Sequence, residues 1–453
     1  MSSLQSLIDQ VDDSIKEIIY MNQELTKIPS INTGFMPTGN ETLVAEFLRD
    51  SLLDDGISSN LIGKDPKRNN FISDYPSVSD KTKLMFMSHT DVVPVENEEK
   101  WKFDPFSGTI HEGRVYGRGS NDCKALLTTQ MMAFKILKRN NITLDYGLKL
   151  VSGADEEHGG KWGFRWLAEK HPELITSDYA INEGGSVSIQ ADNKLVLSIG
   201  VGEKGRLELK FKIKGESGHA STPWMGKNAS FQLGKLLKNL EEYKPEIITT
   251  LPFFNHLHNF GVEEKIDSSN FDKLIDRLDN SYPLVSSLSK ALSQMLITPT
   301  MVQGGIKSNS IPEEIILTCD IRNLPFQKID YITSEIEKIS QDIDGLTYDL
   351  EYMSEPNESK FDSALADAII ESQSIIQNNK EIKWIPLHSP GFTDSTYTRR
   401  LGITTYGFYG SDPQDDATLN NIHGTNESIG IASLISGTKS MLAIAYKMCM
   451  NKL

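Results

Sequence analysis

Hydrophobic and polar positions in the first part of the chain follow two periods, one helical and the other typical of buried strands. Continuous apolar runs at 83–88 and 146–152 predict strands buried on both faces, and the first of these strands ends at His89. Spacings of three and four residues predict amphipathic helices at 4–19, 41–55 and 124–137. Strands that alternate with helices indicate an α/β fold, in which ligands bind at the carboxyl ends of the strands.

The pattern changes near residue 203, where strict alternation begins. Residues 206–214 predict a strand with one buried face, formed by Leu207, Leu209, Phe211 and Ile213. The patterns that follow have the order of a ferredoxin-like β-α-β-β-α-β module. They predict a helix at about 228–240, a strand pair around 301–322, a helix at about 330–343 and a strand at 346–353.

The α/β pattern resumes at about residue 355. It predicts a helix at 361–377, strands near 382–387 and 403–409, and a final helix at 428–448. We therefore expect a split α/β domain, 1–203 and 355–453, around an inserted α+β domain, 204–354. Residues 241–300 exceed what the module needs and predict a helical insertion.

Five short motifs of acidic residues and histidine lie in a fixed order along the chain. They are Ser-His-Thr-Asp at 88–91, Gly-Arg-Gly-Ser-Asn-Asp at 117–122, Asp-Glu-Glu-His-Gly-Gly at 155–160, Asn-Glu-Gly-Gly at 182–185 and His-Gly-Thr-Asn-Glu at 423–427. These motifs offer five metal ligands, namely His89, Asp122, Glu157, Glu183 and His423. Glu156 is left over beside one ligand, where it can deprotonate a water activated by metal. The pattern predicts a two-metal amide hydrolase.

Each motif also has a structural interpretation. Asp91 lies two residues after His89 in an extended segment, so its carboxylate can hold the second imidazole nitrogen, although a lone His-Thr-Asp is structural more often than not. Asp122 can bridge two cations or cap the helix at 124–137. A Glu-Glu pair such as 156–157 is common on helix surfaces, but this one follows a buried strand.

Three polar residues of the predicted inserted domain are candidates for substrate contacts and are surface residues by default. His219 lies among small residues and can donate a hydrogen bond to an oxyanion, while Asn309 and Arg322 can bind a substrate. The guanidinium of arginine can donate two parallel hydrogen bonds to a carboxylate. His256 and His258 lie in the helical insertion, where contact with substrate is the less favoured interpretation.

Composition narrows the class of protein. A net charge of −16 argues against nucleic-acid binding, and no apolar run is long enough to span a membrane. The N-terminus lacks the basic start and apolar core of a signal peptide. Three widely spaced cysteines predict no disulfide framework and favour a cytoplasmic location, and Cys123 is interpreted as a packing residue. The sequence contains neither a Gly-x-Ser-x-Gly elbow nor a phosphate-binding Gly-x-x-x-x-Gly-Lys loop.

Nine segments in order resemble the family of di-zinc amidohydrolases and exopeptidases, which includes acetylornithine deacetylase, succinyl-diaminopimelate desuccinylase, aminoacylase, glutamate carboxypeptidase and cytosolic dipeptidases. They are HTDVVP, GRGSNDCK, DEEHGG, NEGG, GESGHAS, GGIKSNSIPEE, CDIR, PGFTDS and HGTNES. The resemblance covers nearly the whole chain. Glu183, in place of the aspartate of several members, favours the aminoacylase and carboxypeptidase branch.

The resemblance implies a phosphorylase/hydrolase-like catalytic domain with a ferredoxin-like lid that also forms a homodimer. It implies His89 and Glu183 on one metal, Glu157 and His423 on the other, and Asp122 between them. It also implies Glu156 as general base and Asp91 as the carboxylate behind His89. His219 would then serve the partner's active site, and Asn309, Arg322 and the Gly391 loop would bind the substrate carboxylate. The expected metal is zinc, with cobalt or manganese as alternatives.

The expected reaction is the hydrolysis of an amide whose product carries a free α-carboxylate, as in an N-acyl-amino-acid deacylase or an exopeptidase. A biosynthetic deacylase for acetylornithine or succinyl-diaminopimelate and a dipeptidase are the alternatives within the enzyme class. The alternative outside that class is a non-catalytic scaffold of the same fold. All six positions of ligands and base are filled in this sequence, which disfavours a scaffold.

Overall fold

The computed structural model of the chain describes residues 3–36 and 38–451. The chain forms two compact units. The first unit comprises Met1–Val201, Ser359–Leu387 and Thr393–Leu453, and the second comprises Gly202–Glu358 and His388–Phe392. No helix among the described residues is long and apolar enough to cross a membrane.

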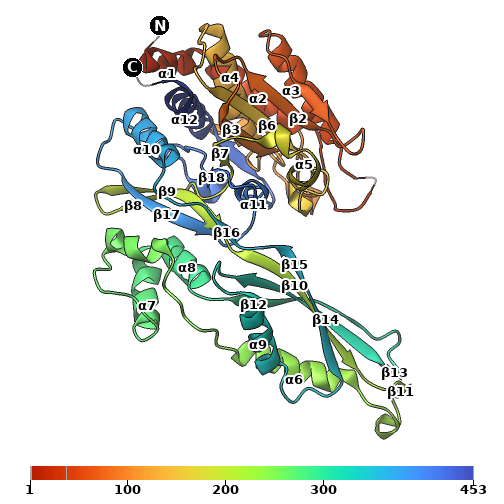
Figure 1. Cartoon of the computed structure of the whole chain (residues 1–453). Helices are drawn as coiled ribbons and strands as arrows, with labels where there is room; N and C mark the ends of the chain where they lie inside the picture. Colours follow the sequence, from red (N-terminus) through yellow and green to blue (C-terminus); the bar gives the residue numbers. More distant parts are fainter. Residues whose placement is uncertain (1–2, 37, 452–453) are drawn as a thin grey trace. The chain divides into compact units, whose positions relative to one another are not determined.

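A mixed sheet with the strand order β1-β2-β6-β3-β7-β18-β9 forms the centre of the first unit (Figure 1). Its middle pairs, β6 with β3, β3 with β7 and β7 with β18, are parallel, which confirms the expected α/β fold. The strands are β1 Asn60–Ile62, β2 Asn70–Tyr75, β3 Thr82–His89, β6 Gly147–Gly153, β7 Tyr179–Asn182, β9 Lys194–Glu203 and β18 Thr404–Gly407. Two more strands, β8 Ser188–Ala191 and β17 Lys383–Ser389, pair with β9.

Helices cover both faces of this sheet because successive side chains of its buried strands point to opposite faces. In β3, Leu84 and Phe86 belong to one apolar core, while Met85 and Met87 belong to the other. The first core is closed by the helices α1 Leu4–Asp13, α2 Ile15–Lys27, α3 Glu41–Leu53, α4 Lys124–Arg139, α10 Ala364–Ile376 and α12 Ile431–Cys449. The second core is closed by α5 Phe164–Lys170 and α11 Ser395–Arg400.

The predicted first helix at 4–19 is divided into α1 and α2 at Ser14. The apolar spacing continues across the division, which is why the sequence pattern did not reveal it. Ser14 has φ −97° and ψ 2°, and its hydroxyl donates to the carbonyl of Gln10 at 2.9 Å. Serine competes in this way with regular helical hydrogen bonding.

The second unit contains an antiparallel sheet with the order β12-β14-β10-β15. Its strands are β10 Gly205–Lys214, β12 Leu296–Gly304, β14 Glu314–Asn323 and β15 Leu346–Ser354, and its helices are α6 Ala229–Glu242 and α9 Ile329–Ile339. The chain order β10-α6-β12-β14-α9-β15 confirms the expected ferredoxin-like module. Both helices pack on the face of β10 that carries Leu207, Leu209, Phe211 and Ile213.

Residues 243–295, between α6 and β12, contain the helical insertion. It consists of the 3-10 helix η5 Pro252–Phe260, α7 Phe271–Ser281 and α8 Pro283–Leu292. Lys204 ties it to the start of β10, because the buried Nζ donates to the carbonyls of Ala291 and Gln294, each at 2.7 Å. At the other end of the unit, the short strands β11 Gly218–His219 and β13 Ser310–Ile311 pair with each other.

Candidate metal centre

Three parallel strands of the first unit carry predicted ligands at their carboxyl ends. His89 is the last residue of β3, and Glu183 follows β7. Glu156 and Glu157 follow β6 in the 3-10 helix η2 Glu156–His158. Because parallel strands end at one edge of the sheet, side chains distant in sequence meet there.

Asp122 lies between the two histidines, with one carboxylate oxygen near each imidazole. Its Oδ1 is 2.9 Å from Nε2 of His89, and its Oδ2 is 3.2 Å from Nε2 of His423. Glu183 Oε2 is 3.6 Å from the same His89 nitrogen, and Glu157 Oε2 is 3.2 Å from the same His423 nitrogen. We call these five residues, together with Glu156, the His–carboxylate cluster.

The alternative interpretation of Asp122 as a helix cap does not hold. Cys123 occupies the N-cap position of α4, and no side chain caps that helix end. Cys123 is buried, and its burial and the nearby Glu183 raise the pKa of its thiol well above the usual value. A protonated, buried thiol agrees with the interpretation of Cys123 as a packing residue.

Asp91 lies behind the cluster and accepts more hydrogen bonds than the sequence suggested. The expected partner, Nδ1 of His89, is 3.5 Å from the Asp91 carboxylate and 3.0 Å from the Asp91 backbone carbonyl, which is the nearer acceptor. The carboxylate accepts from the backbone N–H groups of Glu156 at 3.1 Å and Glu157 at 3.2 Å. Asp91 therefore holds the turn that presents both glutamates.

Burial and crowded negative charge shape the ionisation of the cluster. Burial, followed by the charges of neighbouring carboxylates, raises the pKa of Glu156 well above its usual value and that of Glu157 to about 7. Hydrogen bonds to Asp122 and Glu157 raise the pKa of His423 to about 10. Burial alone would lower the pKa of His89, but Glu183 and other neighbours raise it well above its usual value.

The donor set fits divalent metal. Ligand atoms of His89, Asp122 and Glu157 lie within 4.8 Å of one another. Oε1 of Glu157 is buried and has no hydrogen-bond partner, although a buried acceptor is normally satisfied. Dications would give these carboxylates the positive charge that protonated imidazoles otherwise supply, and would displace the imidazole protons.

The cluster is supported by residues from the N-terminal segment that sequence reasoning missed. Asn32 donates to Asp91 at 2.8 Å and to Asp155 at 2.9 Å. Arg68 donates to the same oxygen of Asp155 at 3.1 Å and is paired with Glu41. The acidic motif at 155–160 pointed to Asp155 without giving it a role, whereas nothing in the sequence marked Asn32 or Arg68.

Asp394 is a further buried acid that sequence reasoning left without a role, although its motif, PGFTDS, was noted. Its Oδ2 is buried and has no hydrogen-bond partner. Burial, and after it repulsion by carboxylates that include Asp91 and Glu183, raises the pKa of Asp394 well above its usual value. Asp394 adds to the negative potential around Glu156.

The remaining predicted site residues belong to the second unit and form two pairs. His219 and Asn309 meet at the β11–β13 hairpin, where the Asn309 carbonyl accepts from the N–H of Ala220 at 3.0 Å. Arg322 donates to Asp320 at 2.6 Å and to the carbonyl of Pro390 at 3.4 Å, next to Gly391.

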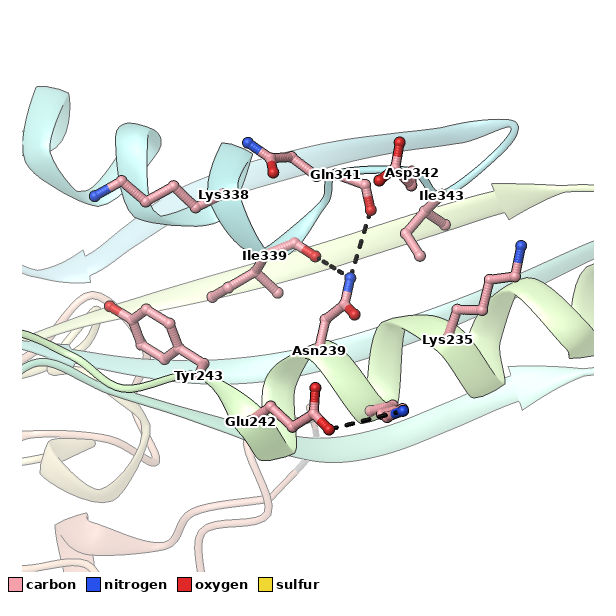
Figure 2. Close-up of a pocket in the computed structure, with 10 residues that line it drawn as sticks. Lys235, Asn239, Glu242, Tyr243, Lys338, Ile339, Gln341, Asp342 and Ile343 are labelled. Atoms are coloured by element: carbon pink, nitrogen blue, oxygen red, sulfur yellow. Dashed lines mark hydrogen bonds and ion pairs between the residues drawn. The ribbon is translucent and has the colours of Figure 1, made fainter.

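Among the cavities lined by described residues, two that lie outside the cluster are well formed. One, of about 400 Å³, lies in the second unit between α6 and the segment after α9, where Asn239 donates to the carbonyls of Ile339 and Gln341 (Figure 2). The other, of about 570 Å³, lies in the first unit near Thr82 and Gly147, where β3 and β6 begin. In an α/β sheet this is the edge opposite to the one that binds ligands.

Comparison with known proteins agrees with this geometry. The profile of Peptidase family M20/M25/M40 matches residues 85–447. The chain belongs to this family. Its fold and its acidic motifs are therefore those of a metal-dependent hydrolase that acts on amide bonds.

Relatives of this M20/M25/M40 chain agree with that class. An uncharacterized metallohydrolase of Methanocaldococcus jannaschii is 29% identical over 74% of this chain and 75% of its own length. Carboxypeptidase S of Saccharomyces cerevisiae is 28% identical over 81% of this chain and 71% of its own length. The M20 family metallo-carboxypeptidase Sso-CP2 of Sulfolobus solfataricus shares the fold, with a TM-score of 0.71 and 21% identity. The match covers 95% of this chain and 99% of that structure.

Proposed function

We propose that this chain is a two-metal exopeptidase or N-acyl-amino-acid deacylase that releases a product with a free α-carboxylate. One observation carries the proposal: Asp122 directs one oxygen to His89 at 2.9 Å and the other to His423 at 3.2 Å. A carboxylate so placed suits a bridge between two cations. A scaffold protein would have no need of such an arrangement.

The ligands divide naturally into two sets around that bridge. His89 and Glu183, which lie side by side, would hold one metal, and Glu157 and His423, also adjacent, would hold the other. Carboxylate and imidazole donors suit zinc, with cobalt or manganese as alternatives. When bound, the metals supply Lewis acidity, which polarises the scissile carbonyl and lowers the pKa of the attacking water.

Glu156 moves the proton during the reaction. It is buried beside Glu157, and the N–H groups of both residues are held by Asp91. A carboxylate in this position can accept a proton from water and return it to the departing amine nitrogen. His219 donates a hydrogen bond to the oxyanion.

The second unit binds the substrate. Arg322 already faces a carboxylate, Asp320, and a loop carbonyl, and its guanidinium suits the α-carboxylate of a substrate. The N–H of Gly391 donates to the hydroxyl of Ser389 at 3.1 Å, which orders the same loop. Asn309 is the third residue that we propose to bind the substrate carboxylate. We assign the split domain, 1–203 and 355–453, to catalysis and the inserted domain, 204–354, to a lid.

A homodimer formed through the inserted domain is part of this proposal, with His219 serving the partner's site. β12 is an edge strand, exposed over most of its length, that offers unpaired backbone groups. Large apolar side chains are exposed in the same unit, including Trp224 at 78% and Ile306 at 96%. Three buried free cysteines suit the reducing cytoplasm.

The test is hydrolysis of matched substrates by the purified protein. N-acetyl-amino acids, acetylornithine, succinyl-diaminopimelate and dipeptides are compared with the same compounds carrying a methyl ester in place of the α-carboxylate. We expect metal-dependent turnover of at least one free acid and a large loss on esterification. Equal turnover of acid and ester would contradict the carboxylate requirement, and turnover by metal-free protein would contradict the chemistry.

A further inference from the structure

The loop that carries Asp122 closes around a carboxylate from the far end of the chain. Oε2 of Glu427 accepts from Arg118 at 2.6 Å and from the N–H of Gly119 at 3.0 Å. Oε1 accepts from the N–H groups of Asn121 at 3.1 Å and Asp122 at 3.0 Å. Successive backbone N–H groups that converge in this way form an anion-binding nest. Here the anion is supplied by the protein itself.

The same contact fixes the loop of the second histidine. Glu427 lies four residues after His423, and its backbone carbonyl accepts from the N–H of Gly117 at 2.9 Å. Arg118 also donates to the His423 carbonyl at 3.1 Å. His423 has φ +61°, a left-handed conformation that is uncommon for non-glycine residues. The two loops are thus joined by side chains and by backbone.

The ion pair between Arg118 and Glu427 is deeply buried, so water cannot readily replace either side chain. The side chains of Arg118 and Glu427 are 2% and 1% exposed. Removing one partner would leave the other charge without compensation in the interior. The ion pair joins the loop that carries Asp122 to the loop that carries His423. Oδ2 of Asp122 is 3.2 Å from Nε2 of His423.

We propose that Glu427 is a positioning residue that assembles the metal centre by docking the His423 loop into the nest of the Asp122 loop. This inference rests on the proposed metal site. Both carboxylate oxygens of Glu427 are taken by donors of the Asp122 loop, so Glu427 acts behind the ligands. It sets the separation of two ligands that come from segments 301 residues apart in sequence. Partners of this kind, behind the ligands, typically contribute about 10–100-fold to metal affinity.

The experiment measures zinc affinity by competition with a chelator in the full-length protein. Glu427→Ala removes a CH₂–COO⁻ group, which corresponds to acetate, so added acetate can refill the nest. Glu427→Gln keeps the size but turns an amide N–H₂ toward the donors. Glu99→Ala, at an exposed acidic residue, is the matched control. Far-UV circular dichroism and thermal melting establish that each variant is folded.

We expect zinc affinity to fall about 10–100-fold in both Glu427 variants, and acetate to restore it in Glu427→Ala alone. The Glu99→Ala protein and the wild type should not respond to acetate. Affinity within threefold of wild type in Glu427→Gln, or a defect in Glu427→Ala that acetate does not reduce, would overturn the inference. If Glu427→Ala does not fold, the zinc affinity of Glu427→Gln alone tests the inference. A wild type that binds no zinc would instead overturn the proposed metal site.

Discussion

Replacing Arg68 with methionine tests whether the buried network behind the acidic turn holds the catalytic fold together. Arg68 Nε lies 3.1 and 3.0 Å from the two oxygens of Glu41, and its NH2 group lies 3.1 Å from Asp155. The three side chains are 3%, 0% and 3% exposed. Methionine fills much of the same volume but leaves two carboxylates buried without their cation.

The magnitude follows from this burial. Breaking a buried ion pair by removing one partner costs about 3–5 kcal/mol, because the remaining charge stays desolvated. Arg49→Met is the matched control, because Arg49 pairs with Asp50 where the two side chains are 41% and 66% exposed. Exposed pairs contribute at most about 1 kcal/mol.

Urea unfolding followed by tryptophan fluorescence measures the difference, since four of the five tryptophans belong to the first unit. We expect Arg68→Met to lower the free energy of unfolding by about 3–5 kcal/mol and Arg49→Met by less than about 1 kcal/mol. The double variant Arg68→Met/Glu41→Gln should recover part of the loss. A decrease below about 1 kcal/mol in Arg68→Met would refute the reasoning.

Three further predictions address the base, a buried lysine and the dimer. Glu156→Gln should retain its metals and lose about 10²-fold or more in kcat, and a near-normal rate would exclude Glu156 as the base. Burial, and after it the charge of Arg322, lowers the pKa of Lys204 to about 7. Above that pH the unfolded chain binds more protons than the folded one, so the stability of wild type relative to Lys204→Met should increase as the pH rises from 7 toward 10. Calorimetry measures this stability difference at each pH, and a difference that does not change with pH would contradict the lowered pKa of Lys204. Ile306→Asp should convert a dimer to monomer in sedimentation velocity, and a wild type that is monomeric while active would contradict His219 acting in trans.

Local patterns predicted several of the strands, because apolar periodicity reflects burial directly. The apolar run at 83–88 predicted β3, and the ligand at its end was recognised from its motif. The alternation at 206–214 likewise marked β10, whose four inward side chains are all buried. The strand ends meet at one edge of the sheet, so motif order predicted that His89, Glu157 and Glu183 would lie together.

Contacts that depend on tertiary packing were not predictable in this way. Asn32 and Arg68 are ordinary polar residues in sequence, and only the fold brings them to Asp91 and Asp155. The nearer acceptor for His89 Nδ1, a backbone carbonyl, has no sequence signature at all. Glu427 lay within a recognised motif, but its four donors come from a loop about 300 residues earlier.

Titration of metal-free protein with zinc tests the central claim most directly. Hydrolysis of the substrate selected above is followed while bound metal is counted per chain. Our account predicts no turnover without metal and full turnover only when both positions around Asp122 are filled, at two ions per chain. Full activity in metal-free protein, or protein that holds no metal with the site residues intact, would contradict it.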